Sequence, residues 1–196
     1  MKIGYLIAGF IIFLVTLSPI LCYDIDLRWE QRYDGGLEDM AHSVAIDSKD
    51  NVIITGTSRD ILRRDRDFYT IKYDKNGNVV WENRYNVGIR DESFGVAIDS
   101  KDNIVTVGTA SGKYFIIKYN KDGELIWTYS PSRGNDDVAY AVAIDSEDNI
   151  VLTGRTKIVV YNYYTLKFDK DGNLLWRVMW TGGEDDVPYG IAIDSM

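Results

Sequence analysis

The sequence has few of the residues that build disulfide or transition-metal scaffolds. Its 196 residues include one cysteine, Cys22, and one histidine, His42. A single cysteine excludes an internal disulfide, and its place in an apolar leader excludes a cysteine nucleophile in the folded part. A single histidine excludes an imidazole metal cluster. Ser43 follows His42 directly, and strand neighbours point to opposite faces, so the two are not a catalytic pair. We predict no catalytic residues and no metal site of these kinds.

Positive charge is also scarce. The chain has 22 Lys and Arg against 30 Asp and Glu, a formal net charge of −8. Nucleic acid and anionic lipid surfaces attract basic proteins, so neither is expected as a partner of the folded part. Aromatic residues, by contrast, are abundant: 14 Tyr, 5 Trp and 6 Phe supply ample mass for a packed core.

The N-terminus carries an uncharged apolar run, Ile3 to Cys22, after Lys2. A basic start and an apolar run indicate export. The run is long for a cleaved signal and matches the ~20 residues that span a bilayer. Residues 1–22 are therefore predicted to form a hydrophobic helix that is either a cleaved signal peptide or a retained membrane anchor. Lipidation of Cys22 is less favoured because Leu21 precedes it. Each alternative places residues 23–196 outside the cytoplasm, secreted or anchored, with membrane contact only through this segment.

The rest of the chain is an internal repeat. The phrase VAID or IAID begins at Val44, Val96, Val142 and Ile191, with spacings of 52, 46 and 49. A tryptophan precedes each phrase by 15 residues, and a glycine follows each of the first three by 12 residues. Such periods are typical of repeat architectures. The recurring residues are Trp29, Trp81, Trp127 and Trp176, and Gly56, Gly108 and Gly154.

Each repeat reads as two β-hairpins. VAID, the polar break SKDN and VIIT make the first hairpin of the first copy, and FYTIKY, DKNGN and VVWENRY make the second. Turn residues of this kind supply left-handed backbone angles. No sustained helical periodicity follows Tyr23. Lysines recur in the third strand and are expected to face solvent by alternation; these are Lys72, Lys118 and Lys167.

Four antiparallel strands in 40–50 residues predict an all-β fold of β-propeller blades. The tryptophan is expected on the outermost strand, where it packs between blades. We expect three complete blades, at about residues 44–85, 96–131 and 142–180. Partial strands are expected at both ends, an outer strand at Leu27–Tyr33 and the start of a fourth unit at 189–196.

These residues resemble a known repeat family. The stretches TGGEDDVPYGIAIDS from Thr181 and YDGGLEDMAHSVAIDSKDNVIITGT from Tyr33 are similar to the SBBP repeat of exported bacterial and archaeal β-propellers. The resemblance covers about residues 29–196. YDKNGNVVW is more loosely similar to the docking motif of quinoprotein propellers, which include dehydrogenases and non-enzymatic assembly factors.

The last copy ends inside its first strand, and three blades do not close a ring. Known single-chain propellers use about 4–8 blades. Three explanations are open: a truncated or split product of a longer gene, ring closure by self-association or by another chain, or an open arc. We favour truncation, because the end falls inside the best-matching motif.

An aspartate recurs ten residues after each tryptophan, in the loops that enter the blades: Asp39, Asp91, Asp137 and Asp186. A ring of carboxylates near the axis is a candidate site for a cation or cationic ligand, since calcium needs several converging oxygens. The favoured alternative is that each aspartate bonds the backbone of its own turn. DKDGN at 169–173 opens like a calcium loop but lacks the downstream glutamate. No cofactor is predicted, with calcium as the alternative.

The loops between second and third strands share one face with the entering loops and vary in length, at 57–67, 109–113 and 155–162. The first, TSRDILRRDRD, is rich in arginine. Variable loops carry recognition. The predicted function is a non-enzymatic, exported interaction module that binds protein or glycan at the cell surface. The alternative is a fragment of a propeller enzyme, either a divalent-cation-dependent lyase or a quinoprotein-like enzyme.

Overall fold

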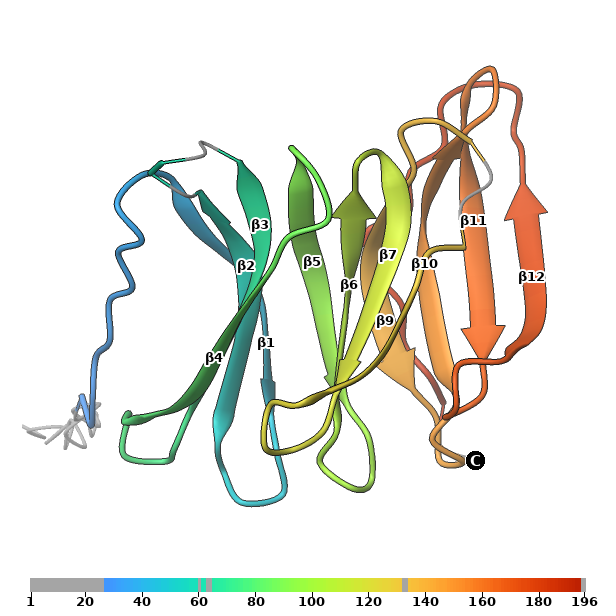
Figure 1. The fold of residues 1–196 in the computed structure, drawn as a ribbon. Coiled ribbons are helices and arrows are strands. Elements are labelled where there is room, and N and C mark those ends of the chain that lie inside the picture. The colour runs from blue at the N-terminus through green and yellow to red at the C-terminus, as the bar shows by residue number, and fades with distance from the viewer. Residues whose placement is uncertain (1–26, 60, 63–64, 132–133, 195–196) are drawn as a thin grey trace, which may run out of the picture.

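The computed structural model describes residues 27–59, 61–62, 65–131 and 134–194. Within these ranges the chain forms three four-stranded antiparallel sheets, each with its strands in sequence order. Figure 1 shows the sheets side by side from blue to red, and we call them blades 1, 2 and 3. The all-β prediction and the four strands per unit are confirmed.

The strands of the three blades have these bounds. Blade 1 contains β1 (Asp39–Ile46), β2 (Val52–Arg59), β3 (Arg66–Tyr73) and β4 (Val79–Tyr85). Blade 2 contains β5 (Asp91–Ile98), β6 (Ile104–Ala110), β7 (Lys113–Tyr119) and β8 (Leu125–Tyr129). Blade 3 contains β9 (Val138–Ile144), β10 (Ile150–Lys157), β11 (Tyr161–Phe168) and β12 (Leu174–Trp180).

The repeated polar motifs form the hairpin turns. In the first hairpin of blade 1, Asp47 Oδ1 accepts hydrogen bonds from the amides of Lys49 and Asn51, both at 2.9 Å. Asp50 in this turn has a φ of 63°, a left-handed conformation that Asp tolerates better than most residues. In the second hairpin Gly77 takes a φ of 85°. Blades 2 and 3 repeat both turns, with left-handed Asp102, Asp148, Gly123 and Gly172.

The hydrophobic core lies between blades. One cluster joins Ile53 and Phe68 of blade 1 to Ile104, Phe115 and Ile117 of blade 2. The corresponding cluster between blades 2 and 3 contains Tyr114, Ile116, Leu152 and Leu166. One blade alone is a two-sided apolar sheet that would leave these side chains in water. Stacking therefore stabilises the fold, and each blade depends on its neighbours.

The repeated tryptophan packs onto the left-handed glycine of the following blade, as expected for an outer-strand residue. A Cβ placed on Gly123 would lie 2.8 Å from Trp81, and one placed on Gly172 would lie 3.2 Å from Trp127. Glycine is required twice over at these positions, for its positive φ and for the closeness of the indole. Trp81 and Trp127 thus bridge blade 1 to blade 2 and blade 2 to blade 3.

The repeated lysines do not face solvent, and that prediction was wrong. Lys72 and Lys118 are 4% and 3% exposed, and their ammonium groups lie 2.8 Å and 3.0 Å from Asp47 and Asp99. Each ammonium also donates to a backbone carbonyl of the next blade, at Lys121 (3.1 Å) and Lys170 (3.0 Å). The neighbouring blade covers a face that alternation alone would leave in water. Lys167 pairs with Asp145 at 2.8 Å in the same way and is more open.

These ion pairs predict loss of stability in acid. Burial raises the pKa of Asp47, but hydrogen bonds from Lys72 and Asn51 outweigh it and lower the pKa from 3.8 to about 2. The pKa of Asp99 is also lowered, because hydrogen bonds from Asn103 and Lys118 outweigh the effect of burial. A carboxyl with a depressed folded-state pKa stabilises the protein above its unfolded pKa and loses that contribution as pH falls. The urea midpoint should therefore drop between about pH 4 and pH 2. A constant midpoint over that window would contradict the assignment.

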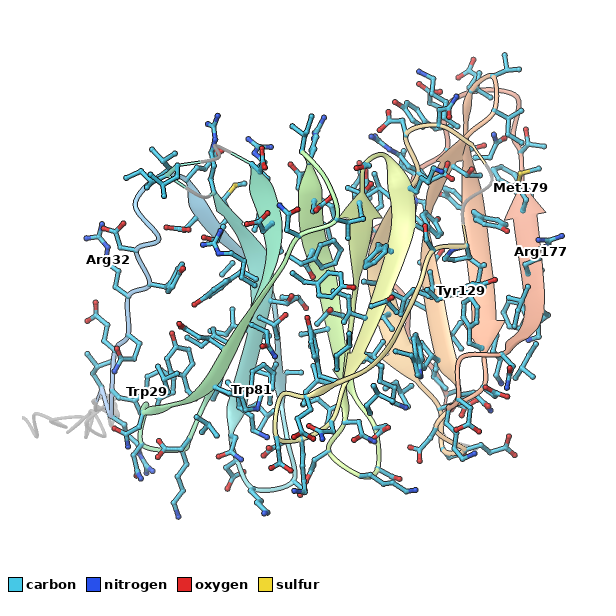
Figure 2. All side chains as sticks on the ribbon, in the orientation of Figure 1. Trp29, Arg32, Trp81, Tyr129, Arg177 and Met179 are labelled. Carbon is cyan, nitrogen blue, oxygen red and sulfur yellow. The ribbon has the colours of Figure 1, made fainter. Side chains whose placement is uncertain are left out.

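The two ends differ from prediction. Residues 27–33 and the described part of the expected fourth unit, 189–194, form no strand. A strand needs a neighbour for its ladder hydrogen bonds, and neither segment has one among the described residues. Residues 27–33 nevertheless occupy the place of an outer strand. Trp29 lies over Gly77 and Tyr73 as Trp81 lies over Gly123 and Tyr119. Figure 2 shows Trp29 on the extended N-terminal segment beside blade 1.

The predicted hydrophobic helix and Cys22 lie outside the described residues. In the described ranges, no helix has the length and hydropathy that a bilayer span requires.

Candidate functional site

The loops that enter the blades and the loops between second and third strands gather at one end of the molecule, the upper end in Figure 1. Backbone hydrogen bonds tie the two kinds of loop together. Ser111 N donates to Arg90 O at 3.0 Å, and Asp137 N donates to Gly112 O at 2.8 Å. We call this end the loop face. The short turns that carry the buried Lys–Asp pairs lie at the opposite end.

Three arginines surround a shallow hollow on the loop face, which we call the arginine hollow. Its volume is about 440 Å³, and Arg59, Arg66, Ile89 and Arg90 line it. The backbone sets this arrangement. Arg59 and Arg66 are paired residues at the ends of β2 and β3, and Arg66 forms a parallel bridge with Arg90 in the loop that enters blade 2. Residues 24 positions apart in sequence thus meet where blades 1 and 2 join.

Two glutamates hold the central arginine. Arg66 donates to Glu92 at 2.5 Å and to Glu38 at 2.7 Å. The hydrogen bond to Glu92 is the main cause that raises the pKa of Arg66. Arg90 approaches Glu92 at 3.4 Å and keeps a side chain that is 70% exposed. The hollow thus combines arginine side chains with two glutamates in a protein that is acidic as a whole.

A second polar cluster occupies the loop face of blade 3. The guanidinium of Arg155 lies 4.2 Å from the ring centroid of Tyr161 and 5.9 Å from that of Tyr140. Tyr161 donates to Asp136 at 2.5 Å, and Arg155 lies 3.4 Å from the same carboxylate. Cation–π contact and the ion pair hold Arg155 against the rings. The side chain of Arg155 is 25% exposed, against 70% for Arg90 of the arginine hollow.

The four repeated aspartates each accept hydrogen bonds within their own loop. These bonds are the kind that the turn role predicts. Asp91 and Asp137 are fully buried, and burial raises the pKa of Asp91 although loop amides bond it. The described residues contain no group of three or more His, Cys, Asp or Glu that could hold a metal ion. The donors include Gly35 N and Ser58 Oγ to Asp39, Val87 N and Gly88 N to Asp91, Gly134 N, Thr156 Oγ1 and Lys157 N to Asp137, and Gly182 N to Asp186.

Sequence reasoning missed a ladder of rings along the inner strands. His42 stacks on Phe94 with ring centroids 4.9 Å apart, Phe94 lies 5.5 Å from Tyr140, and Tyr140 lies 5.7 Å from Tyr189. His42 and Phe94 sit at the β-bulges of β1 and β5, which turn the extra side chain toward the next blade. The signal was present: each ring lies two residues before the repeated Val or Ile.

Comparisons with known proteins agree with this architecture. No protein-family model matches the chain. The chain is 31% identical to an uncharacterised WD repeat-containing protein of Acanthamoeba polyphaga mimivirus over a 98-position alignment, which covers 41% of this chain and 7% of that protein. A chain in a crystal structure of the eukaryotic initiation factor superposes with a TM-score of 0.53 at 13% identity, covering 78% of this chain and 35% of that one.

The chain is built from β-propeller-type repeats. The three four-stranded sheets, the WD-repeat relative and the propeller-like structural neighbour agree on this. At 13% identity the structural likeness shows the fold alone. Propeller folds host many unrelated functions, so the activity has to be argued from the loop face.

Proposed function

We propose that this protein is a non-enzymatic interaction module whose arginine hollow binds an acidic segment of a partner protein. The observation that carries the proposal is the convergence of Arg59, Arg66 and Arg90 on one hollow in a protein of net charge −8. Guanidinium groups bind carboxylates through paired hydrogen bonds. A propeller-like repeat fold is a common scaffold for such recognition, and its loops supply the contacts.

Two of the arginines have different roles in this proposal. Arg66 is held by Glu38 and Glu92, so it maintains the floor of the hollow. Arg90, with its exposed side chain, is the residue that reaches a partner carboxylate. Ile89 is 80% exposed beside it and offers an apolar contact next to the charge. An acidic segment with a neighbouring apolar residue fits this combination.

We also propose that the repeats are of the SBBP type and that the protein acts outside the cytoplasm, at the cell surface. The SBBP proposal rests on the phrase from Tyr33 and its partner from Thr181. The location rests on the apolar run after Lys2, which is typical of export.

The binding proposal predicts a specific loss in Arg90→Ala. A fluorescently labelled poly-glutamate peptide, followed by anisotropy, should bind the wild type and bind Arg90→Ala ~10-fold more weakly, the size expected when one charged interface contact is lost. The matched control is Lys121→Ala, an exposed lysine at the opposite end of the molecule whose side chain is 54% exposed. Binding should weaken with salt, because the contact is between exposed charges.

Two results would contradict this proposal. One is an equal loss of peptide binding in Lys121→Ala, which would show a general charge effect. The other is binding of an acidic glycan with no binding of the peptide, which would show that the hollow binds a glycan and not a protein segment.

A further inference from the structure

The two contacts between blades use one repeated set of interactions, which we call the blade contact set. In both, a tryptophan covers a left-handed glycine and a buried lysine donates to a backbone carbonyl of the next blade. A turn serine completes the set. The amide and Oγ of Ser48 donate to Asp102 at 2.9 Å and 2.7 Å, and those of Ser100 donate to Asp148 at 2.8 Å and 2.7 Å.

A pair of aromatic residues in the third strands extends the set. Phe68 of blade 1 packs on Phe115 of blade 2, with centroids 5.8 Å apart. Tyr114 of blade 2 packs on Tyr164 of blade 3 at 5.6 Å. Phe68 and Tyr114 are 1% and 0% exposed, so this contact is the dry centre of each interface.

Blade 3 carries the residues that a preceding blade contributes to the set, on its face away from blade 2. Ser146, Lys167, Trp176 and Tyr163 hold the four positions. Among the described residues, no turn aspartate faces Ser146 and no blade follows to supply a carbonyl for Lys167. Trp176 is 43% exposed and Tyr163 is 38% exposed. Val178 and Trp180 extend the apolar stripe along β12, at 58% and 55% exposure.

Blade 1 carries the matching acceptors on its opposite face. Asp50 has the left-handed conformation of Asp102 and Asp148, and Gly77 lies in the turn that corresponds to Gly123 and Gly172. A cavity of about 410 Å³ lies on this blade, lined by Ile54, Tyr69 and Ile71 among others and by residues 30–33 of the N-terminal segment. Tyr69 corresponds to Phe115 and Tyr164, the rings that receive an aromatic side chain from the preceding blade. The cavity therefore lies where such a side chain would enter.

We propose that two copies of this chain associate head to tail, with blade 3 of one copy docked on blade 1 of the other. Ser146 would then bond Asp50, Lys167 would donate to the Lys75 carbonyl, and Tyr163 would enter the cavity beside Tyr69. The set of contacts is the one already present twice within the chain. Two such contacts around a two-fold axis close a ring of six blades, within the ~4–8 blades of known propellers.

Docking requires two segments to give way. Trp29 holds the place on Gly77 that Trp176 of the other copy would take, and Tyr33 of the same segment stacks on Tyr69 with ring centroids 4.2 Å apart. Residues 189–194 lie beside blade 3, with Tyr189 on Tyr140, where β1 of the other copy would lie. Neither segment belongs to a sheet, whereas β12 is held by its full ladder with β11. Strand-borne Trp176 is therefore expected to displace Trp29.

Disulfide trapping tests this geometry directly. In the 196-residue chain with Cys22→Ser, the pair Asp50→Cys and Ser146→Cys should form a disulfide between chains, giving a covalent dimer of twice 22.3 kDa. The control pair, Ser100→Cys with Asp148→Cys, occupies the same two positions within one chain and should form an intrachain bond. Formation of the control bond with no interchain bond in the test pair would overturn the proposal.

Sedimentation velocity on single variants provides the second measurement. Trp176→Ala should weaken self-association ~10-fold, as expected for an aromatic contact at the centre of an interface. Arg177→Ala, on the opposite face of β12, should leave association unchanged. Figure 2 labels Arg177 and Met179 on this strand. Trp29→Ala should strengthen association, because it vacates Gly77. A wild-type monomer at all concentrations, or equal effects of Trp176→Ala and Arg177→Ala, would overturn the proposal whether or not the arginine hollow binds peptide.

Discussion

Replacement of Gly108 by alanine should destabilise the protein by ~3 kcal/mol or more, at the upper end of the range for overpacked cores. A Cβ at this position would lie 1.9 Å from the backbone oxygen of Glu92 and 2.9 Å from the Cα of Ser93. Both atoms belong to the strand that pairs with β6, next to its bulge. Backbone atoms cannot rotate away as a side chain can. Relief therefore requires the bulge to open or the two strands to separate.

Urea unfolding, followed by tryptophan fluorescence, measures this loss. The matched control is Gly190→Ala, because nothing lies within 4 Å of a Cβ at Gly190 and its φ is not in the left-handed region. The control should keep the wild-type midpoint within experimental error. An unchanged midpoint in Gly108→Ala would mean that the strands accommodate the methyl group. The recurrence of glycine at this position of the repeat would then need a different explanation.

Lys118→Met should cost ~3–5 kcal/mol, the range for breaking a buried ion pair from one side. The change removes the ammonium group that pairs with Asp99 at 3.0 Å and donates to the Lys170 carbonyl. Methionine keeps most of the apolar stem. Asp99, whose side chain is 3% exposed, then loses its counter-charge while Asn103 still bonds it. The larger part of the cost is the carboxylate left in a site with little water.

The control for this variant is Lys121→Met, which removes an exposed ion pair with Asp122 on the same blade. Exposed pairs contribute ~0–1 kcal/mol, so this change should be small. A second test combines Lys118→Met with Asp99→Asn, which removes the stranded charge and should recover part of the loss. If the two lysine variants have equal effects, the buried pair has no special role in stability.

Much of the fold could be predicted because its signals are local. The turns depend on Asp, Asn and Gly within five consecutive residues, and the hairpins depend on apolar runs on either side. The tryptophan position followed from its constant spacing. The turn role of the four aspartates also follows from a short-range rule, and the structure shows hydrogen bonds of that kind.

The missed features depend on contacts between distant parts of the chain. Lys72 is 25 residues from Asp47 and 49 residues from Lys121, the two residues whose oxygens surround its ammonium group. Alternation within β3 carries no information about the blade that covers it. The ring ladder was overlooked for the same reason, since His42 and Phe94 meet only when bulged strands of two blades lie side by side. The arginine hollow needed the pairing of Arg66 with Arg90, which no local pattern supplies.

The blade contact set gives this molecule a direction. Each blade presents side-chain donors on one face and backbone and carboxylate acceptors on the other, so a blade can follow its neighbour in only one sense. Duplication of one coding unit therefore adds a blade whose two faces already match its surroundings. The repeats differ in length in the loops of the loop face, at the opposite end from the turns that carry Ser48 and Ser100. The recognition loops can therefore vary while the contacts between blades stay the same. Within one repeat, the residues that allow further blades to be added are thereby separate from the loops whose sequence and length vary.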